Sequence, residues 1–181
     1  MTEYRTELVD SFELELSGEA ADLEKQLGEI YQEMGINYPK FYKMNVLCKL
    51  GFIGAEKITS NNTSLFSEIA KDQVATIFFN RSSSLVSDHE HMTSIHRQSI
   101  PSPAVFVYTL PNILNGEIAI RNEWTGYSAF YLMENYEASK IDELVNIGRH
   151  CQSFSLCLAG WVETDLANQK YSLKIMLYKV N

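Results

Sequence analysis

Two β-rich apolar runs, Val74–Phe79 and Phe154–Val162, constrain the fold of this chain more than any other feature. Neither run has the polar-apolar alternation of a strand with one wet face, so each is typical of a central strand that is covered on both faces. A strand of this kind needs helices above and below its sheet. The two runs therefore predict a layered arrangement of a sheet and helices.

Helical patterns occupy much of the chain outside these strands. Apolar residues recur at spacings of three and four from Ala20 to Met34, and Gly35 follows as a stop, which predicts an amphipathic helix. Asn45 can cap a second helix that runs to about Ile58 and is apolar around nearly its whole circumference, so we expect it to be buried on most sides. Its glycines, Gly51 and Gly54, weaken helix propensity and indicate close backbone packing.

The remaining segments complete an alternating order of strands and helices. Phe12–Leu16 alternates and predicts a short strand, Ser128–Met133 is another buried strand candidate, and a strand with alternating Leu173, Ile175 and Leu177 closes the chain. We expect helices over Asn112–Ile120 and Ile141–Gly148, a loop over Ser60–Ser64, and a long polar loop with a short helical piece over Asn80–Ser102.

These elements predict one α/β domain over residues 1–181, with a mixed, mostly parallel sheet and helices on both faces. The last two strands are expected to be antiparallel neighbours, because the link Glu163–Gln169 is short enough for a hairpin.

The charge balance excludes several classes of partner. Fifteen Lys and Arg residues against 23 Asp and Glu residues give a net charge of −8, without the clustered cations that a phosphate-binding surface needs. We therefore expect neither nucleic acid nor an anionic membrane as a partner. The first residues are too polar for a signal peptide, and no apolar run approaches the ~18 residues of a membrane span, so a cytoplasmic location is expected.

Three cysteines, Cys48, Cys151 and Cys157, make neither a disulfide framework nor a four-thiolate metal site. Cys48 lies within the buried helix and is expected in the core. His150 and Cys151 are adjacent, but neighbours on a helix diverge by ~100° and do not pair as base and nucleophile. Because Cys151 and Cys157 flank an apolar segment, we interpret both as small buried hydrophobic residues.

The sequence Asp88-His89-Glu90-His91, with His96 nearby, is the most metal-like cluster in the chain. A spacing of two places His89 and His91 on different sides of a helix, and the pattern matches no zinc-ligand spacing, so we interpret it as a solvated polar loop. No cofactor-binding motif is present, and we expect no metal and no cofactor. Glu117 is either a buried acid or a solvated carboxylate at a helix edge, which is the commoner arrangement.

A series of motifs resembles the β-ketoacyl synthase family, the condensing enzymes with a thiolase-like layered α/β fold. The motifs are Lys43-Met44 with the helix that follows, Pro101–Asn112, Gly116–Ile120, Gly126 and Leu158–Glu163. Their order and approximate spacing agree with the first half of a condensing enzyme over residues 40–165. The resemblance implies an acyl-thioester context, either fatty-acid or polyketide synthesis, with a ketosynthase or an acyl carrier protein as partner. It also implies a homo- or heterodimer that pairs along the sheet edge near the nucleophile strand.

The departures from this family are as informative as the agreement. A condensing enzyme needs a cysteine at the amino end of a buried helix, where backbone N–H groups lower its pKa and bind the oxyanion. At the matching turn the chain has Glu134-Asn135-Tyr136, and Glu134 or Asn135 falls nearest the nucleophile position. The half that carries the family's catalytic histidines has no counterpart. The leading hypothesis is a non-catalytic ketosynthase-like partner of a complete ketosynthase or a carrier protein.

Two alternatives come from other classes of function. Glu134, near Asn112, could act as a base on an acyl thioester if burial raised its pKa. The chain could also be a binding module whose tunnel is lined by Phe106, Tyr108, Phe130 or Leu132, although aromatic residues of this kind are more often core. Phe106, Tyr108 and Asn112 are the candidate binding residues.

The missing half adds one expectation about the surface. If half of a two-lobed fold stands alone, the face that met the other half is exposed. Large exposed apolar patches usually mark interfaces, so we expect such a patch and a dimer.

Overall fold

The computed structural model describes residues 6–98, 102–165 and 167–180. Its strands are β1 (Thr6–Ser17), β2 (Val74–Asn80), β3 (Ser128–Leu132), β4 (Leu156–Asp165) and β5 (Lys170–Val180). Its helices are α1 (Ala20–Glu33), α2 (Val46–Asn61), α3 (Thr63–Glu68), α4 (Leu85–Gln98), α5 (Pro103–Val107), α6 (Ile113–Asn122) and α7 (Ala138–Cys151), with short 3-10 helices at Pro39–Lys43 and Lys71–Gln73. None of the described helices is long and apolar enough to cross a membrane.

The five strands form one mixed sheet in the order β1-β5-β4-β2-β3. β2 runs parallel to β3 and β4, whereas β5 runs antiparallel to β4 and to β1. The predicted hairpin between the last two strands is confirmed, with Asp165 opposite Lys170. The parallel part is smaller than "mostly parallel" implied, because the hairpin and β1 together add two antiparallel pairs to the two parallel ones.

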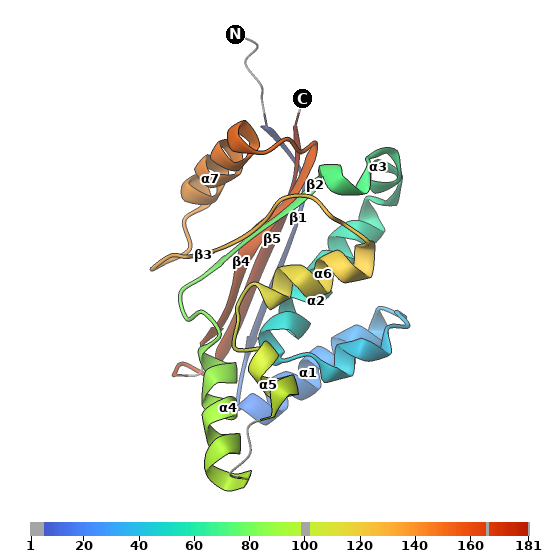
Figure 1. Cartoon of the computed structure of the whole chain (residues 1–181). Coiled ribbons are helices and arrows are strands. Elements are labelled where there is room, and N and C mark those ends of the chain that lie inside the picture. Colours follow the sequence, from blue (N-terminus) through green and yellow to red (C-terminus); the bar gives the residue numbers. More distant parts are fainter. Residues whose placement is uncertain (1–5, 99–101, 166, 181) are drawn as a thin grey trace.

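Helices cover both faces of the sheet, as predicted. Figure 1 shows α7 on one face and α1, α2 and α6 on the other. Each face has its own hydrophobic cluster, the larger one beneath α2 and the smaller one beneath α7. β2 is buried along its whole length, and β4 is buried from Leu156 to Thr164, which confirms both runs as central strands.

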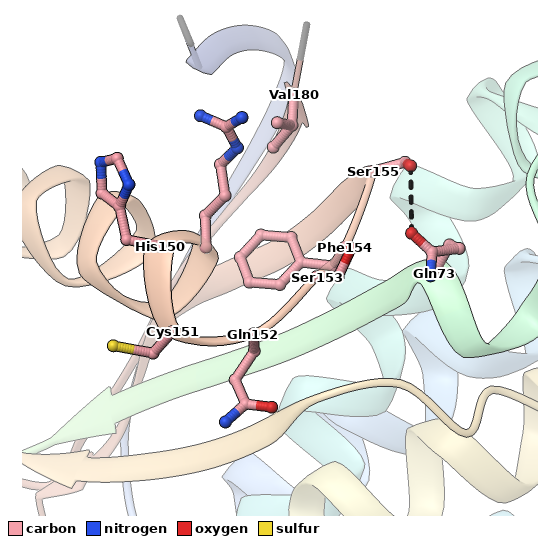
Figure 2. Close-up of a pocket in the computed structure, with 9 residues that line it drawn as sticks. Gln73, His150, Cys151, Gln152, Ser153, Phe154, Ser155 and Val180 are labelled. Atoms are coloured by element: carbon pink, nitrogen blue, oxygen red, sulfur yellow. Dashed lines mark hydrogen bonds between the residues drawn. The ribbon is translucent and has the colours of Figure 1, made fainter. Parts of the chain in front are cut away.

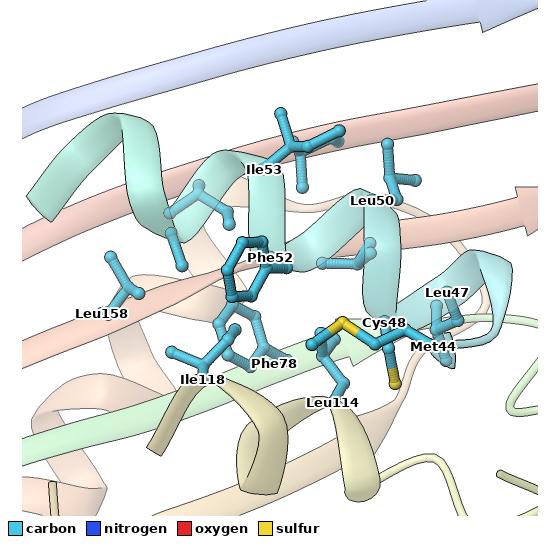
Figure 3. Packing of buried hydrophobic residues seen from close by; sticks show 14 of the residues in the cluster. Met44, Leu47, Cys48, Leu50, Phe52, Ile53, Phe78, Leu114, Ile118 and Leu158 are labelled. Atoms are coloured by element: carbon cyan, nitrogen blue, oxygen red, sulfur yellow. The ribbon is translucent and has the colours of Figure 1, made fainter. Parts of the chain in front are cut away.

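The helix α2 is the centre of the larger cluster (Figure 3). The Asn45 side chain caps it by accepting a hydrogen bond from the Cys48 amide at 2.9 Å. An added Cβ at Gly51 would lie 2.3 Å from Leu114 of α6, and one at Gly54 would lie 2.6 Å from Ile175 of β5. The two glycines therefore let α2 approach α6 and the sheet closely, as their presence in an apolar helix predicted.

Two glycines from the family-like motifs have a similar backbone role. An added Cβ at Gly126, just before β3, would lie 2.3 Å from the carbonyl oxygen of Val74. At Gly160 in β4 it would lie 2.4 Å from the carbonyl oxygen of Lys174. Backbone atoms cannot rotate away, so both positions require glycine.

Three local predictions were wrong. Residues 85–98 form the helix α4 rather than a loop with a short helical piece, because its buried positions are held mainly by small side chains such as Ser87 and Val86 and give no apolar period. The predicted loop at Ser60–Ser64 is instead the junction of α2 and α3. β3 is not a buried strand: it lies at the sheet edge, and Leu132 is 62% exposed.

The helix α7 differs from the buried helix that the family resemblance implies. Its inner side chains, Ile141 and Val145, are buried in the smaller cluster. Its outer side carries Lys140, Asp142 and Glu143, which are exposed and polar. This outer side is that of a surface helix.

Substituting Gly160 tests the close approach of β4 and β5. We expect Gly160→Ala to lower the free energy of unfolding by about 3 kcal/mol, since the new methyl group meets backbone atoms. Gly28→Ala in α1 is the matched control: a Cβ there meets nothing within 4 Å. It should raise the free energy of unfolding by about 1 kcal/mol through helix propensity. Urea unfolding followed by circular dichroism measures both, and equal stabilities would contradict the packing described.

Candidate functional site

The carboxyl ends of the parallel strands β2, β3 and β4 lie together at one end of the sheet. Open α/β sheets bind ligands at this position. A hollow of about 180 Å³ lies at this end. It is lined by Arg81, Glu134, Asn135, Tyr136, Trp161, Glu163, Asp165, Lys170 and Ser172. The predicted residues Glu134 and Asn135 do lie here, immediately before α7, and both are exposed.

Glu163 is the buried acid of this end, with 5% of its surface exposed. Its Oε2 accepts hydrogen bonds from the backbone amides of Arg81 at 2.7 Å and Ser82 at 3.2 Å. Its Oε1 accepts a third from the Thr164 amide at 3.0 Å. The amides that follow β2 are therefore already paired with a carboxylate, and they are not free to stabilise an oxyanion.

The amino end of α7 lacks the nucleophile of a condensing enzyme. The helix begins Ala138-Ser139-Lys140, and the preceding residue, Glu137, makes no side-chain capping bond. Ser139 in the first turn is the only hydroxyl in that turn, and sequence reasoning did not consider it. It is exposed, and among the described residues no base is hydrogen-bonded to it, so nothing activates it.

The three thiols lie away from this end of α7. Cys48 and Cys157 are buried in the two clusters, and burial raises the pKa of both thiols. Cys151 is exposed, so its interpretation as a buried residue was wrong. It is the last residue of α7, at the carboxyl end, where the partial negative charge of the helix dipole does not stabilise a thiolate.

Cys151 borders a hollow of about 560 Å³ at the opposite end of the sheet. Figure 2 shows the His150 and Cys151 side chains on different sides of the helix end, as their adjacency predicted. Most of the lining is polar backbone and side chain of residues 149–155, and the Ser155 hydroxyl bonds to Gln73 across it. The geometry provides no paired nucleophile and base.

The histidine cluster also does not form a metal site. His89 and His91 lie on α4, and the His91 ring packs at 5.5 Å from the ring of Phe106. Within the described ranges no group of three or more His, Cys, Asp or Glu side chains is placed to hold a metal ion.

Glu117 is part of a buried polar cluster. The sequence allowed either a buried or a solvated position for this carboxylate. It is 5% exposed, and its Oε2 lies 2.6 Å from the Lys40 ammonium, while the Tyr108 hydroxyl donates to its Oε1 at 3.1 Å. The hydrogen bond to Glu117 raises the pKa of Lys40, and burial followed by the Glu117 charge raises that of Tyr108. Lys40 comes from a segment far away in the sequence, so the local pattern around Tyr108 and Glu117 could not have revealed the ion pair.

The candidate binding residues do not form a tunnel. Phe106 is 55% exposed, Asn112 is exposed, and Tyr108 bonds to Glu117. The buried asparagine of this region is instead Asn115, whose amide nitrogen donates to the carbonyl oxygens of Thr76 at 3.0 Å and Ala129 at 3.1 Å and fixes α6 to the sheet.

Glu163 and Glu134 border the same hollow, which allows a matched test of their roles. We expect Glu163→Gln to lower the free energy of unfolding by about 2 kcal/mol, because an amide group cannot accept all three backbone hydrogen bonds. Glu134→Gln should change it by less than about 0.5 kcal/mol, since Glu134 is exposed. Thermal and urea unfolding measure both. A larger effect at Glu134 would contradict the assignment of Glu163 as the structural acid.

The ion pair of Lys40 and Glu117 predicts a pH dependence. Because the pKa of Lys40 is raised above 10.5, the pair stabilises the folded state below that pH, and the contribution is lost as the pH rises through the raised value. At neutral pH we expect Lys40→Met to lower the free energy of unfolding by only about 1 kcal/mol, because the Lys40 side chain is 40% exposed and solvent screens part of its attraction to Glu117. The difference from the wild type should shrink above pH 10.5. Lys25→Met, which removes a fully surface-exposed pair, is the control, and equal effects of both variants would contradict a stabilising pair with the buried Glu117 carboxylate.

The fold of this chain is similar to that of known proteins. No protein-family model and no curated protein matches the sequence. Three solved structures superpose on it with TM-scores of 0.61–0.67 and 11–12% sequence identity. They are the ketosynthase ApeO in complex with its chain length factor ApeC from Xenorhabdus doucetiae (TM-score 0.66, 11%), the ishigamide ketosynthase/chain length factor (0.61, 12%), and AntDE:AntF, a type II PKS acyl-carrier protein in complex with its ketosynthase bound to the hexaketide (0.67, 11%).

The coverage shows how much of those proteins the chain represents. In the order given above, the three superpositions cover 96%, 76% and 97% of this chain. They cover 78%, 44% and 62% of the matched chains. The first matched chain is therefore only modestly longer than this one, whereas the chain spans less than two thirds of the other two. The predicted α/β, thiolase-like layered fold is confirmed: this chain has the fold of part of the ketosynthase and chain-length-factor proteins.

Proposed function

We propose that the chain is a non-catalytic, ketosynthase-like subunit that pairs with a complete ketosynthase in an acyl-chain or polyketide pathway. The observation that carries this proposal is a ketosynthase fold without a thiol at the amino end of the helix after β3. Cys48, Cys151 and Cys157 all lie elsewhere, and the amides after β2 are bonded to Glu163. The scaffold is retained, while the groups that would start acyl transfer are not in place.

The open edge of the sheet supports a pairing role. β3 has β2 on one side, and no described strand pairs with its other side. Exposed apolar side chains occur on this strand and on α4, α5 and the turn after α5; together we call them the apolar rim. They are Leu85, Met92, Phe106, Val107, Leu110 and Leu132. An unpaired strand edge and exposed large apolar side chains are each typical of a surface that associates with another chain.

A complete ketosynthase is the partner that the structural neighbours favour. One matched structure holds a ketosynthase with its chain length factor, and another holds a ketosynthase with an acyl-carrier protein. The net charge of −8 argues against an acidic carrier protein as the main contact, because like charges repel. We therefore assign the apolar rim and β3 to a heterodimer with a ketosynthase.

The two alternative functions have less support. Glu134 is exposed, so it lacks the burial that a carboxylate base at neutral pH requires. A tunnel for an acyl chain would need Phe106, Tyr108, Phe130 and Leu132 around one cavity. Phe106 and Leu132 are instead exposed, and Tyr108 and Phe130 pack against the larger cluster.

Co-expression with the complete ketosynthases of the source organism tests the pairing. We expect one of them to co-purify with the tagged chain as a 1:1 complex whose mass by light scattering is the sum of the two. Leu132→Glu should reduce the recovered complex at least tenfold, because it places a charge at the paired edge. Ile120→Glu on α6 is the matched control, since both residues are 62% exposed.

Each variant is first checked for a wild-type circular dichroism spectrum, so that a folding defect is not taken for lost pairing. Equal loss of the complex in both variants, or full retention with Leu132→Glu, would contradict the proposed interface. A chain that binds none of the ketosynthases would refute the subunit role itself.

A further inference from the structure

A third hollow, about 370 Å³, lies between α1, α4 and β5 beside the start of α2. It is lined by Ala21, Glu24, Val46, Val86, His89, Glu90 and Tyr171. Alanine, valine and tyrosine side chains make its walls, and the charged groups come from α1 and α4. Its size and its mixture of apolar wall with a few polar groups are those of small-ligand sites.

The Tyr171 hydroxyl is an unused hydrogen-bonding group in this hollow. The residue is 1% exposed, and no described residue forms a hydrogen bond with its hydroxyl. Burial, with the nearby charges of Glu24 and Glu90, raises the pKa of Tyr171 to about 12, so the phenol is neutral under ordinary conditions. The hydroxyl oxygen is not fully enclosed and remains accessible beside the hollow, where a bound ligand would form the hydrogen bond that the protein does not provide.

The charges around the hollow favour a cation. The Lys49 ammonium lies 2.6 Å from Glu24 and neutralises it. Glu90 has no ion pair or hydrogen bond with any described residue, and burial followed by the charge of Glu24 raises its pKa. Lys49 and His89 lower that pKa, but neither is bonded to Glu90. Glu90 is an exposed residue, and it is the lining carboxylate of this hollow for which the described residues provide no ion-pair partner.

We infer that this hollow binds a small organic cation, a protonated primary amine on an apolar body. The ammonium group would donate to the Glu90 carboxylate and to the Tyr171 hydroxyl, and the apolar body would lie against Val46 and Val86. An anion would be repelled by Glu24 and Glu90, and a neutral ligand would gain no charge attraction from Glu90. This inference does not depend on the proposed pairing with a ketosynthase, which uses the apolar rim.

Titration with three compounds of one shape tests the chemistry. Phenethylamine, 2-phenylethanol and phenylacetate share a ring and a short chain, and they differ in the charge of the head group. By isothermal calorimetry and by amide chemical shifts of α1 and α4, we expect phenethylamine to bind at least tenfold more tightly than the alcohol. No shift is expected with phenylacetate. Failure of both phenethylamine and hexylamine to bind would overturn the inference.

Substitutions then locate the site. Glu90→Gln should weaken phenethylamine binding about tenfold, which corresponds to ~1.4 kcal/mol. Tyr171→Phe should weaken it about fivefold without lowering the thermal stability, because the hydroxyl has no partner to lose. Glu68→Gln removes the same charge from α3, which lies at the opposite end of the molecule from α4 (Figure 1), and should leave binding unchanged. Equal affinity of the amine for the wild type and for Glu90→Gln would refute the site.

Discussion

The close contact between α2 and the sheet is the constraint on which the rest of the structure depends. Gly51 and Gly54 remove the side chains that would hold α2 away from Leu114 and Ile175. At this short distance α2 is buried on nearly all sides, and α6 can pack beside it. Asn115 then fixes α6 to β2 and β3, which sets the position of the end of the sheet where the candidate site lies.

Several elements could be predicted because their signals are local. β2 and β4 were recognisable as continuous apolar runs, and α2 as an apolar helix with a side-chain cap. Gly126 and Gly160 were identified through the motif resemblance. The structure shows that glycine is needed at both positions because backbone atoms leave no room for a side chain. In each case a short stretch of sequence carries the constraint that the fold imposes.

Other features depend on contacts between distant segments, and no local pattern could show them. The carboxylate of Glu117 is buried with an ion-pair partner, Lys40, that comes from a distant part of the chain, while Tyr108 just before α6 donates a hydrogen bond. The helix α4 buries few large side chains, so its polar sequence resembled a loop. Ser128–Met133 was apolar enough for a central strand, yet nothing in the sequence indicated that no described strand would cover its outer side.

The proposed lack of catalysis is the central claim, and intact-protein mass spectrometry after incubation with an acylated carrier protein tests it most directly. A complete ketosynthase in a parallel sample serves as the positive control and should gain the mass of the acyl group. We expect this chain to keep its unmodified mass under the same conditions. An acyl adduct on Ser139, Cys151 or any other side chain, formed at the rate of the control, would contradict it.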